Sequence, residues 1–178
     1  MNFIKTKIKG LIIVESKVFG DQRGFFFESY SQKEFEDNGI TVQFVQDNQS
    51  RSTKNVLRGL HLQRPPYAQD KLIRVTRGNV FDVAVDVRSG SPTFGQWESI
   101  ILSEENNKMF FIPKGFLHGF VTLSEIVDFE YKVSNYYSKE SEIGIAWNDP
   151  DLNINWPVTN PILSEKDKVN KLLKEVDF

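Results

Sequence analysis

Short hydrophobic blocks separated by turn residues dominate the middle of this sequence, and they restrict the folds that it can adopt. We predict strands over residues 43–48, 56–63, 71–76, 80–87, 97–102, 109–112, 117–123 and 126–133. Breaks fall at 65–66, 78–79, 89–92, 104–107 and 113–115, where Pro, Gly, Ser and Asn gather. Many short strands without helices between them are typical of an antiparallel sandwich or barrel, and a jelly roll is the simplest choice.

Outside this central region, the sequence predicts only two short helices. Residues 11–14 and 25–30 are predicted strands, and the glycines and aspartate of residues 18–24 indicate a turn between them. Ser31 and Glu34 have the spacing of a capping box for a short helix that ends near Gly39. A second short helix is predicted from Ser164 onward. We therefore expect an all-β fold with short flanking helices, in one domain over residues 1–178.

The amino-acid composition excludes several kinds of site. The chain has 178 residues, no cysteine and 2 histidines, so disulfides and thiolate metal sites are excluded. The N-terminus lacks the layout of a signal peptide, and no run of about 18 apolar residues occurs. We expect a soluble, cytoplasmic protein that has neither a membrane nor a nucleic acid as its main partner, since its isoelectric point is about 5.8.

Positive charge is concentrated in one part of the chain. The segment from Arg51 to Arg77 holds seven Lys or Arg residues and a single acid, Asp70, although the whole chain has a net charge of -2. Such a local excess in a slightly acidic protein indicates a small anionic ligand.

Alternate residues of a strand share a face, and this parity predicts which side chains meet inside the barrel. Tyr131 shares its face with Val127 and Phe129 and is expected to point inward, and His118 lies on a face with two phenylalanines. In the strand over 56–63, Arg58 falls on the face opposite His61 unless Gly59 marks a bulge. Parity alone leaves both arrangements of Arg58 open.

Each candidate also has a purely structural interpretation. His61 and Tyr131 are both compatible with hydrogen-bonded core residues, and Lys71, next to Asp70, is compatible with a solvated strand start. Asp167 follows Ser164 by three residues, so the reciprocal acid of a capping box is its simplest role. A metal site is not expected, because His61 and His118 are far apart and no His-x-His pair occurs.

Several strings, in order along nearly the whole chain, resemble the dTDP-4-dehydrorhamnose 3,5-epimerase family. They are GDQRGFFFE from Gly20, QDN from Gln46, LRGLHLQ from Leu57, KLIRV from Lys71, DVAVDVR from Asp82, SPTFG from Ser91, PKGFLHGF from Pro113, NYY from Asn135 and NDPDLNINWP from Asn148. One departure is Leu62, where the family often has an aromatic residue. Leu62 shares the outward parity of Leu60, so little consequence is expected.

The resemblance implies a cupin-like jelly roll that forms a homodimer and inverts C3 and C5 of dTDP-4-dehydro-6-deoxyglucose without metal or organic cofactor. By position, His61 matches the family's base, Tyr131 its acid, Asp167 the residue that orients the base, and Lys71 the cation near the keto oxygen. The positions matching nucleotide-sugar contacts are Arg23, Glu28, Gln46, Asp47, Asn48, Arg58, His118 and Tyr137, with Glu142 and Lys166 as weaker matches. Arg23 is expected to act in the partner subunit, and Tyr137 to stack on thymine.

Three other functions stay open at this stage. A relative that epimerises one carbon, or isomerises a ketosugar, would share the base and the nucleotide site. A metal-dependent oxygenase or isomerase of cupin type would contain stoichiometric metal. A binding module without catalysis would lose only ligand affinity on substitution of His61.

Overall fold

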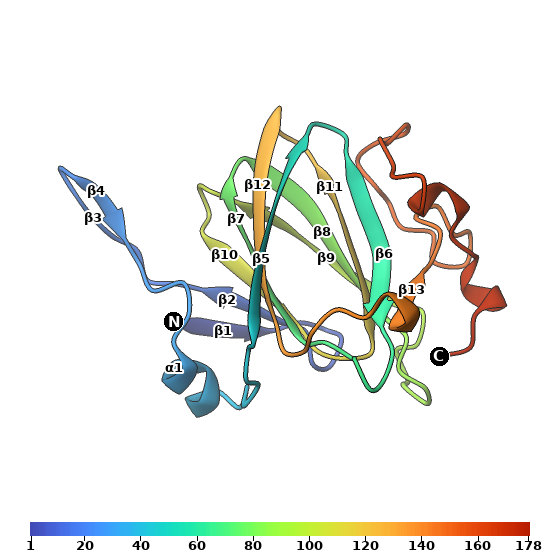
Figure 1. Cartoon of the computed structure of the whole chain (residues 1–178). Coiled ribbons are helices and arrows are strands. Elements are labelled where there is room, and N and C mark those ends of the chain that lie inside the picture. Colours follow the sequence, from blue (N-terminus) through green and yellow to red (C-terminus); the bar gives the residue numbers. More distant parts are fainter.

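The computed structural model describes all of residues 1–178, and two antiparallel sheets face each other in it (Figure 1). The first sheet has the order β1 (Asn2–Lys5), β2 (Ile12–Glu15), β10 (Lys108–Ile112), β7 (Lys71–Arg77), β12 (Ile126–Val133) and β5 (Gln46–Thr53). The second has the order β13 (Glu142–Gly144), β6 (Leu57–Gln63), β11 (Phe116–Thr122), β8 (Asn79–Asp86) and β9 (Trp97–Ser103). The expected all-β jelly roll is confirmed.

The remaining elements are short. A hairpin of β3 (Phe19–Asp21) and β4 (Gly24–Phe26) projects from the body, and α1 (Gln32–Asp37) follows it (Figure 1). The 3₁₀ turns are η1 (Lys139–Ser141), η2 (Asp167–Val169) and η3 (Leu173–Glu175). The C-terminal segment carries η2 and η3 across the outer side of the five-stranded sheet (Figure 1).

Three hydrophobic layers hold these elements together. The layer between the sheets includes Ile73, Ala84, Phe120 and Phe129. A second layer joins the outer side of the five-stranded sheet to the C-terminal segment, and a third places Phe35 of α1 against the outer side of the six-stranded sheet. Each sheet is therefore covered on part of both faces, which explains the long hydrophobic runs in β8 and β11.

A bulge at Gly59 settles the orientation of Arg58. In the pairing of β6 with β11, His61 lies opposite His118 and Arg58 lies opposite Phe120, so the register shifts between these pairs. Gly59 has φ +128°, and its bare Cα lies against the backbone of Gly119. The extra residue turns Arg58 to the same side as His61. Leu60 and Leu62 then point outward into the second hydrophobic layer, as parity predicts.

Some predicted elements differ from the structure. The terminal helix is wrong: the chain forms only the two 3₁₀ turns there. The helix after Ser31 is present but its capping box is wrong, because the Glu34 carboxylate accepts a hydrogen bond from the N-terminal amine instead. β5 runs to Thr53, beyond the predicted end at residue 48, and β1, β3 and β13 were not predicted. No helix of the structure is long and apolar enough to cross a bilayer.

Gly59→Ala tests the close backbone approach that the bulge requires. A Cβ at this position would lie 2.5 Å from Gly119 Cα and 2.8 Å from the His118 carbonyl oxygen, at a φ that alanine rarely adopts. We expect the free energy of unfolding, measured by urea denaturation, to fall by about 2–4 kcal/mol. Gly90→Ala is the control, since Gly90 has φ +73° but open space around it. Equal losses in the two variants would contradict the packing argument.

Candidate active site

A cavity of about 510 Å³ opens between the two sheets near the C-terminal segment. Strands β5, β6, β7, β11 and β12 and the segment over 162–167 all contribute to it. Its polar lining consists of Asn48, Gln49, Ser50, Arg58, His61, Lys71, His118, Tyr131, Ser164, Lys166 and Asp167, and its apolar lining includes Phe120 and Phe129. All four residues with predicted catalytic roles are therefore in one cavity.

His61 and Asp167 form the closest polar contact in this cavity. His61 Nε2 lies 2.6 Å from Asp167 Oδ1, and the carboxylate is 4% exposed. Because an ionised carboxylate only accepts hydrogen bonds, Nε2 is the donor in this contact, and in the neutral form of the ring the lone pair is on Nδ1. The buried acid thus determines which ring nitrogen of His61 faces the open cavity as a potential proton acceptor.

Asp167 reaches His61 because the C-terminal segment folds back over the barrel. Ser164 Oγ accepts a hydrogen bond of 3.1 Å from the Asp167 backbone N–H, so half of the capping arrangement is present. The side chain of Asp167 turns to His61 instead of completing the box. Burial raises the pKa of Asp167, but hydrogen bonds from His61 and Ser164 outweigh it, so its pKa lies below the ordinary value.

Lys71 lies inside the barrel rather than at a solvated strand start. Desolvation lowers the pKa of its ammonium group to about 8, against the opposing attraction of Asp82 and Glu142. A cation held in a dry cavity interacts strongly with any negative charge that develops beside it.

A second imidazole–carboxylate pair lies next to the first. His118 Nε2 is 3.1 and 3.0 Å from the two oxygens of Asp82, which is fully buried. Burial lowers the pKa of His118 and raises that of Asp82. Each histidine therefore has its own carboxylate, and no group of three or more His, Cys, Asp or Glu side chains gathers where it would hold a metal ion.

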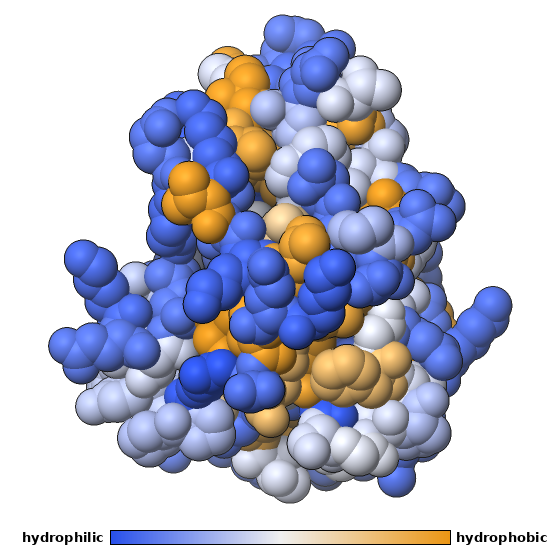
Figure 2. All heavy atoms as spheres, turned by 90° about the vertical axis from the view of Figure 1, so that its right-hand side faces the viewer, coloured by the Kyte–Doolittle hydropathy of each residue, from blue (hydrophilic) through white to orange (hydrophobic).

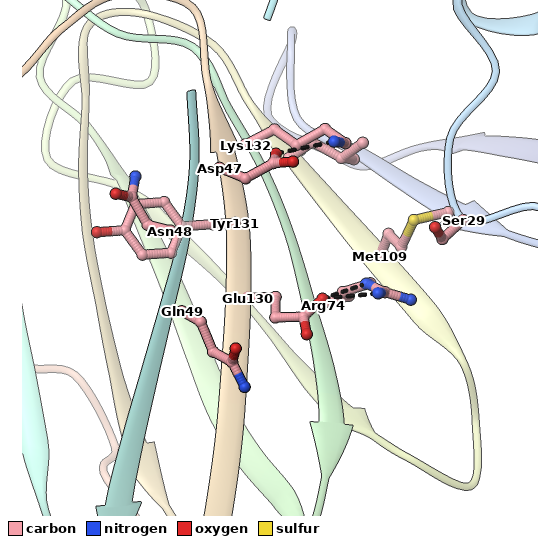
Figure 3. A pocket seen from close by; sticks show the side chains of 10 residues that line it. Ser29, Asp47, Asn48, Gln49, Arg74, Met109, Glu130, Tyr131 and Lys132 are labelled. Carbon is pink, nitrogen blue, oxygen red and sulfur yellow. Dashed lines mark hydrogen bonds and ion pairs between the residues drawn. The ribbon is translucent and has the colours of Figure 1, made fainter. Parts of the chain in front are cut away.

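Tyr131 points inward from β12, as parity predicts. Figure 3, which looks into a neighbouring cavity of about 500 Å³, shows its ring beside Asn48 of β5. The Glu130–Arg74 and Lys132–Asp47 ion pairs lie on the other side of these strands (Figure 3). Burial is the main reason why the pKa of Tyr131 lies above its ordinary value, so the phenol is neutral at pH 7.

The predicted binding residues fall into two groups around the cavity. Arg58 lines it and is held by two 3.1 Å hydrogen bonds to Ser52 Oγ, and Asn48 accepts a hydrogen bond from Gln46. Asp47 lies on the far side of β5, paired with Lys132. The structure therefore places Asp47 outside the cavity that holds Arg58.

Glu142 joins the second group of predicted binding residues. Its carboxylate accepts hydrogen bonds from Tyr137 Oη at 2.9 Å and from Lys166 Nζ at 2.7 Å. Glu142 Oε1 is also 4.0 Å from His61 Nδ1. Burial opposes ionisation of Glu142, but these partners keep its pKa below the ordinary value. Through Lys166, which lines the cavity, this group adjoins the cavity on the side of His61.

Arg23 and Glu28 are not brought to the cavity by the single chain. Arg23 is 90% exposed at the tip of the β3–β4 hairpin and pairs with Asp21, and Glu28 is exposed after the hairpin. Their predicted contacts stay predictions that require a second subunit.

The cation-rich segment does not form one anion site. Of its seven cations, Arg58 and Lys71 line the cavity, whereas four are paired elsewhere. These pairs are Arg51 with Asp128, Lys54 with Glu125, Arg74 with Glu130, and Arg64 with the Asp177 carbonyl oxygen. The local excess of charge thus marks the right strands but overstates the number of cations available to a ligand.

Sequence reasoning did not identify Asp82 as the partner of His118. A signal was present: in β8 Asp82 shares its face with Val80 and Ala84, both in the layer between the sheets. An acid on an apolar face needs a buried partner. Ser164 and Gln49 were also missed, and their surroundings in the sequence carry no comparable signal.

Comparison with known proteins places this geometry in a family. The family model described as dTDP-4-dehydrorhamnose 3,5-epimerase matches residues 5–175. A dTDP-4-dehydrorhamnose 3,5-epimerase from Shigella flexneri is 56% identical over 179 residues, covering 100% of this chain and 99% of that protein.

Solved structures agree with this match. The dTDP-6-deoxy-D-glucose-3,5-epimerase from Legionella pneumophila Philadelphia 1, in complex with dTDP-4-keto-L-rhamnose, has a TM-score of 0.95 and 55% identity, covering 99% of this chain and 94% of that chain. A 3'-monoepimerase from Streptomyces bikiniensis in complex with dTDP-quinovose has a TM-score of 0.90 and 32% identity, covering 95% and 86%. This chain belongs to the dTDP-4-dehydrorhamnose 3,5-epimerase family.

Proposed function

We propose that this protein is an isomerase that converts dTDP-4-dehydro-6-deoxy-D-glucose to dTDP-4-dehydro-L-rhamnose by inverting C3 and C5. The observation that carries the proposal is that a base, a cation and a neutral acid line one cavity, with a buried carboxylate behind the base. Family membership gives the substrate class, since the Legionella relative is in complex with dTDP-4-keto-L-rhamnose.

His61 is the proposed base. A hydrogen next to a ketone is acidic enough for a neutral imidazole to remove, provided that the imidazolium formed is stabilised. Asp167 supplies that stabilisation at Nε2, and Nδ1 is the nitrogen with a free lone pair. Nδ1 therefore takes the proton from the sugar carbon.

Lys71 is the proposed stabiliser of the enolate. Removing the proton places negative charge on the C4 keto oxygen, and a buried ammonium stabilises it better than water does. Loss of one such group typically raises the barrier by about 3–4 kcal/mol.

Tyr131 is the proposed acid. Inversion requires that the new proton arrive on the face opposite the base, because return of a proton from the same face only exchanges it. Tyr131 projects from β12 in the six-stranded sheet and His61 from β6 in the five-stranded sheet, so they approach the cavity from different walls. These groups supply the proton transfers without an organic cofactor.

The remaining cavity residues are proposed to hold the nucleotide. Arg58, fixed by Ser52, has the fork of donors that suits a diphosphate, and His118 and Asn48 are proposed to contact the sugar or the phosphates. Gln46 does not line the cavity but donates a hydrogen bond to Asn48, and it is proposed to contribute to the same contacts. Tyr137 is 57% exposed beside Glu142, as an aromatic ring that is to stack on thymine must be.

We further propose that the chain acts as a homodimer. The projecting hairpin exposes Phe19, Phe25 and Phe26 at 54%, 65% and 66%, and such aromatic exposure is typical of an interface (Figure 1). In this arrangement Arg23 and Glu28 of one subunit would complete the cavity of the other. The single domain over residues 1–178 and the cytoplasmic location stay predictions.

Incubation with the 4-keto sugar nucleotide in deuterated water tests the function directly. We expect deuterium at both C3 and C5 of the product, measured by NMR and mass spectrometry, because both carbons lie next to the C4 ketone. The monoepimerase relative makes single-carbon inversion the specific alternative. Label at only one carbon would favour that alternative, and no label would reject both.

His61→Asn and Tyr131→Phe are expected to have different effects on proton exchange and on inversion. Without the base no proton leaves, so His61→Asn should reduce exchange and inversion together by about 10²–10⁴-fold. Tyr131→Phe keeps the base and the cation, so deuterium exchange should continue while the inverted product falls by about 10²-fold. Normal turnover in Tyr131→Phe would show that another group is the acid.

The pH dependence of kcat/KM tests the role of Lys71. Its pKa is lowered to about 8, so its ammonium form is present below that pH and is lost as the pH rises through it. We expect kcat/KM to fall tenfold per pH unit above about pH 8. Burial raises the pKa of Tyr131 above its ordinary 10.0, so this phenol is still protonated there. A fall that begins only above pH 10 would assign the alkaline limb to Tyr131 instead.

A further inference from the structure

The Asp167–His61 contact depends on how the C-terminal segment is seated on β13. Figure 2 views the molecule from the side of this segment and shows hydrophilic atoms at the surface with hydrophobic atoms visible between them. The hydrophobic layer beneath contains Leu173, Val176 and Phe178. Apolar contact holds the segment down, but it has no direction and does not fix where a carboxylate at residue 167 points.

Polar contacts align the segment with the residues that directly follow β13. The Ala146 backbone N–H donates to the Lys171 carbonyl oxygen at 2.8 Å, and Ile145 and Lys171 form a parallel bridge. The Leu173 backbone N–H donates to Asp149 Oδ2 at 2.7 Å. These contacts set the position of the segment along residues 145–149, but they lie beyond η2.

On the C-terminal side of Asp167, the first contact with β13 is made by Asn170 on Gly144. A Cβ built on Gly144 would lie 2.6 Å from Asn170 Cγ and 2.8 Å from Asn170 Nδ2, so the amide occupies the space where a side chain would be. Gly144 is the register partner of His61 in the pairing of β13 with β6. The Asn170 amide therefore packs on Gly144, the residue that pairs with His61 across the two strands.

Asn170 also touches the acid itself. Its Nδ2 donates a long hydrogen bond of 3.4 Å to Asp167 Oδ1, the same oxygen that contacts His61 Nε2. The amide thus has two contacts: the bare backbone of Gly144 below, and the carboxylate oxygen that orients the base.

We propose that Asn170 is a positioning residue for the reaction, and that its seat on Gly144 sets the placement of Asp167 against His61. This inference rests on the proposed function of His61 as the base. Gly144 is required because any side chain there would displace the amide, and Asn170 because its amide fills the space and contacts the acid.

Three variants test the arrangement. Asn170→Ala removes the amide, and Gly144→Ala displaces it, so each should lower kcat on the order of 10-fold and leave KM unchanged. The double variant Gly144→Ala/Asn170→Ala contains no clash, so it should be no worse than Asn170→Ala alone. Asn160→Ala is the control, since Asn160 is an exposed asparagine of the same C-terminal region. It should keep the wild-type kcat.

Variants made in the Asp167→Asn protein distinguish a positioning role of Asn170 from a role in folding. In Asp167→Asn, the further substitution Asn170→Ala should not lower kcat again, because the contact that Asn170 serves is already lost. A second loss of the same size there, or a Gly144→Ala effect that persists in the Asn170→Ala background, would overturn the proposal.

The outcome is distinguishable from failure of the proposed function. If the wild-type protein exchanged no deuterium, the function itself would be rejected. If wild type were active, His61→Asn inactive, and both Asn170→Ala and Gly144→Ala fully active, only the inference on Asn170 would fail. Thermal unfolding of each variant confirms that the compared proteins are folded.

Discussion

The contact between His61 and Asp167 joins two parts of the chain that differ in their secondary structure. His61 belongs to a strand inside the sheet framework, whereas Asp167 lies in a segment with only short 3₁₀ turns. Such a segment has no hydrogen-bonded ladder of its own to fix it. Its order comes from side chains pressed onto the outer face of the five-stranded sheet and from a few backbone contacts. The acid–base pair is therefore only as well placed as this outer layer is packed.

The alternation of side chains along the strands determines which groups line the cavity. β8 places Val83 and Val85 outward and Asp82 inward, and β12 places Phe129 and Tyr131 inward and Glu130 outward. One strand thus serves the core, the cavity and the outer surface at once. The low pKa of Lys71 follows from the same geometry, because a side chain that points between the sheets is removed from water.

Much of this could be predicted from the sequence because period-two patterns and turn residues are local signals. The strands from β6 to β12 were found within one or two residues, and the inward direction of Tyr131 and His118 followed from parity. The bulge at Gly59 was one of two open alternatives, since it depends on Gly119 across the sheet. The residues from Ser164 onward predict a short helix, but tertiary contacts with the outer face of the five-stranded sheet override that preference and leave two 3₁₀ turns. Likewise, partners far along the chain, such as Asp128 for Arg51, made the cation-rich segment look more available to ligands than it is.

The polar sequence of β5, QDNQSRST, has a consequence beyond the cavity. β5 is the last strand of the six-stranded sheet, so one of its sides offers backbone groups without a neighbouring strand in that sheet. Hydrophobic strands in that position tend to recruit other chains into a growing sheet. Here the strand is hydrophilic, with Asp47, Gln49 and Arg51 exposed to water. These polar and charged side chains thereby discourage aggregation at the edge of the six-stranded sheet.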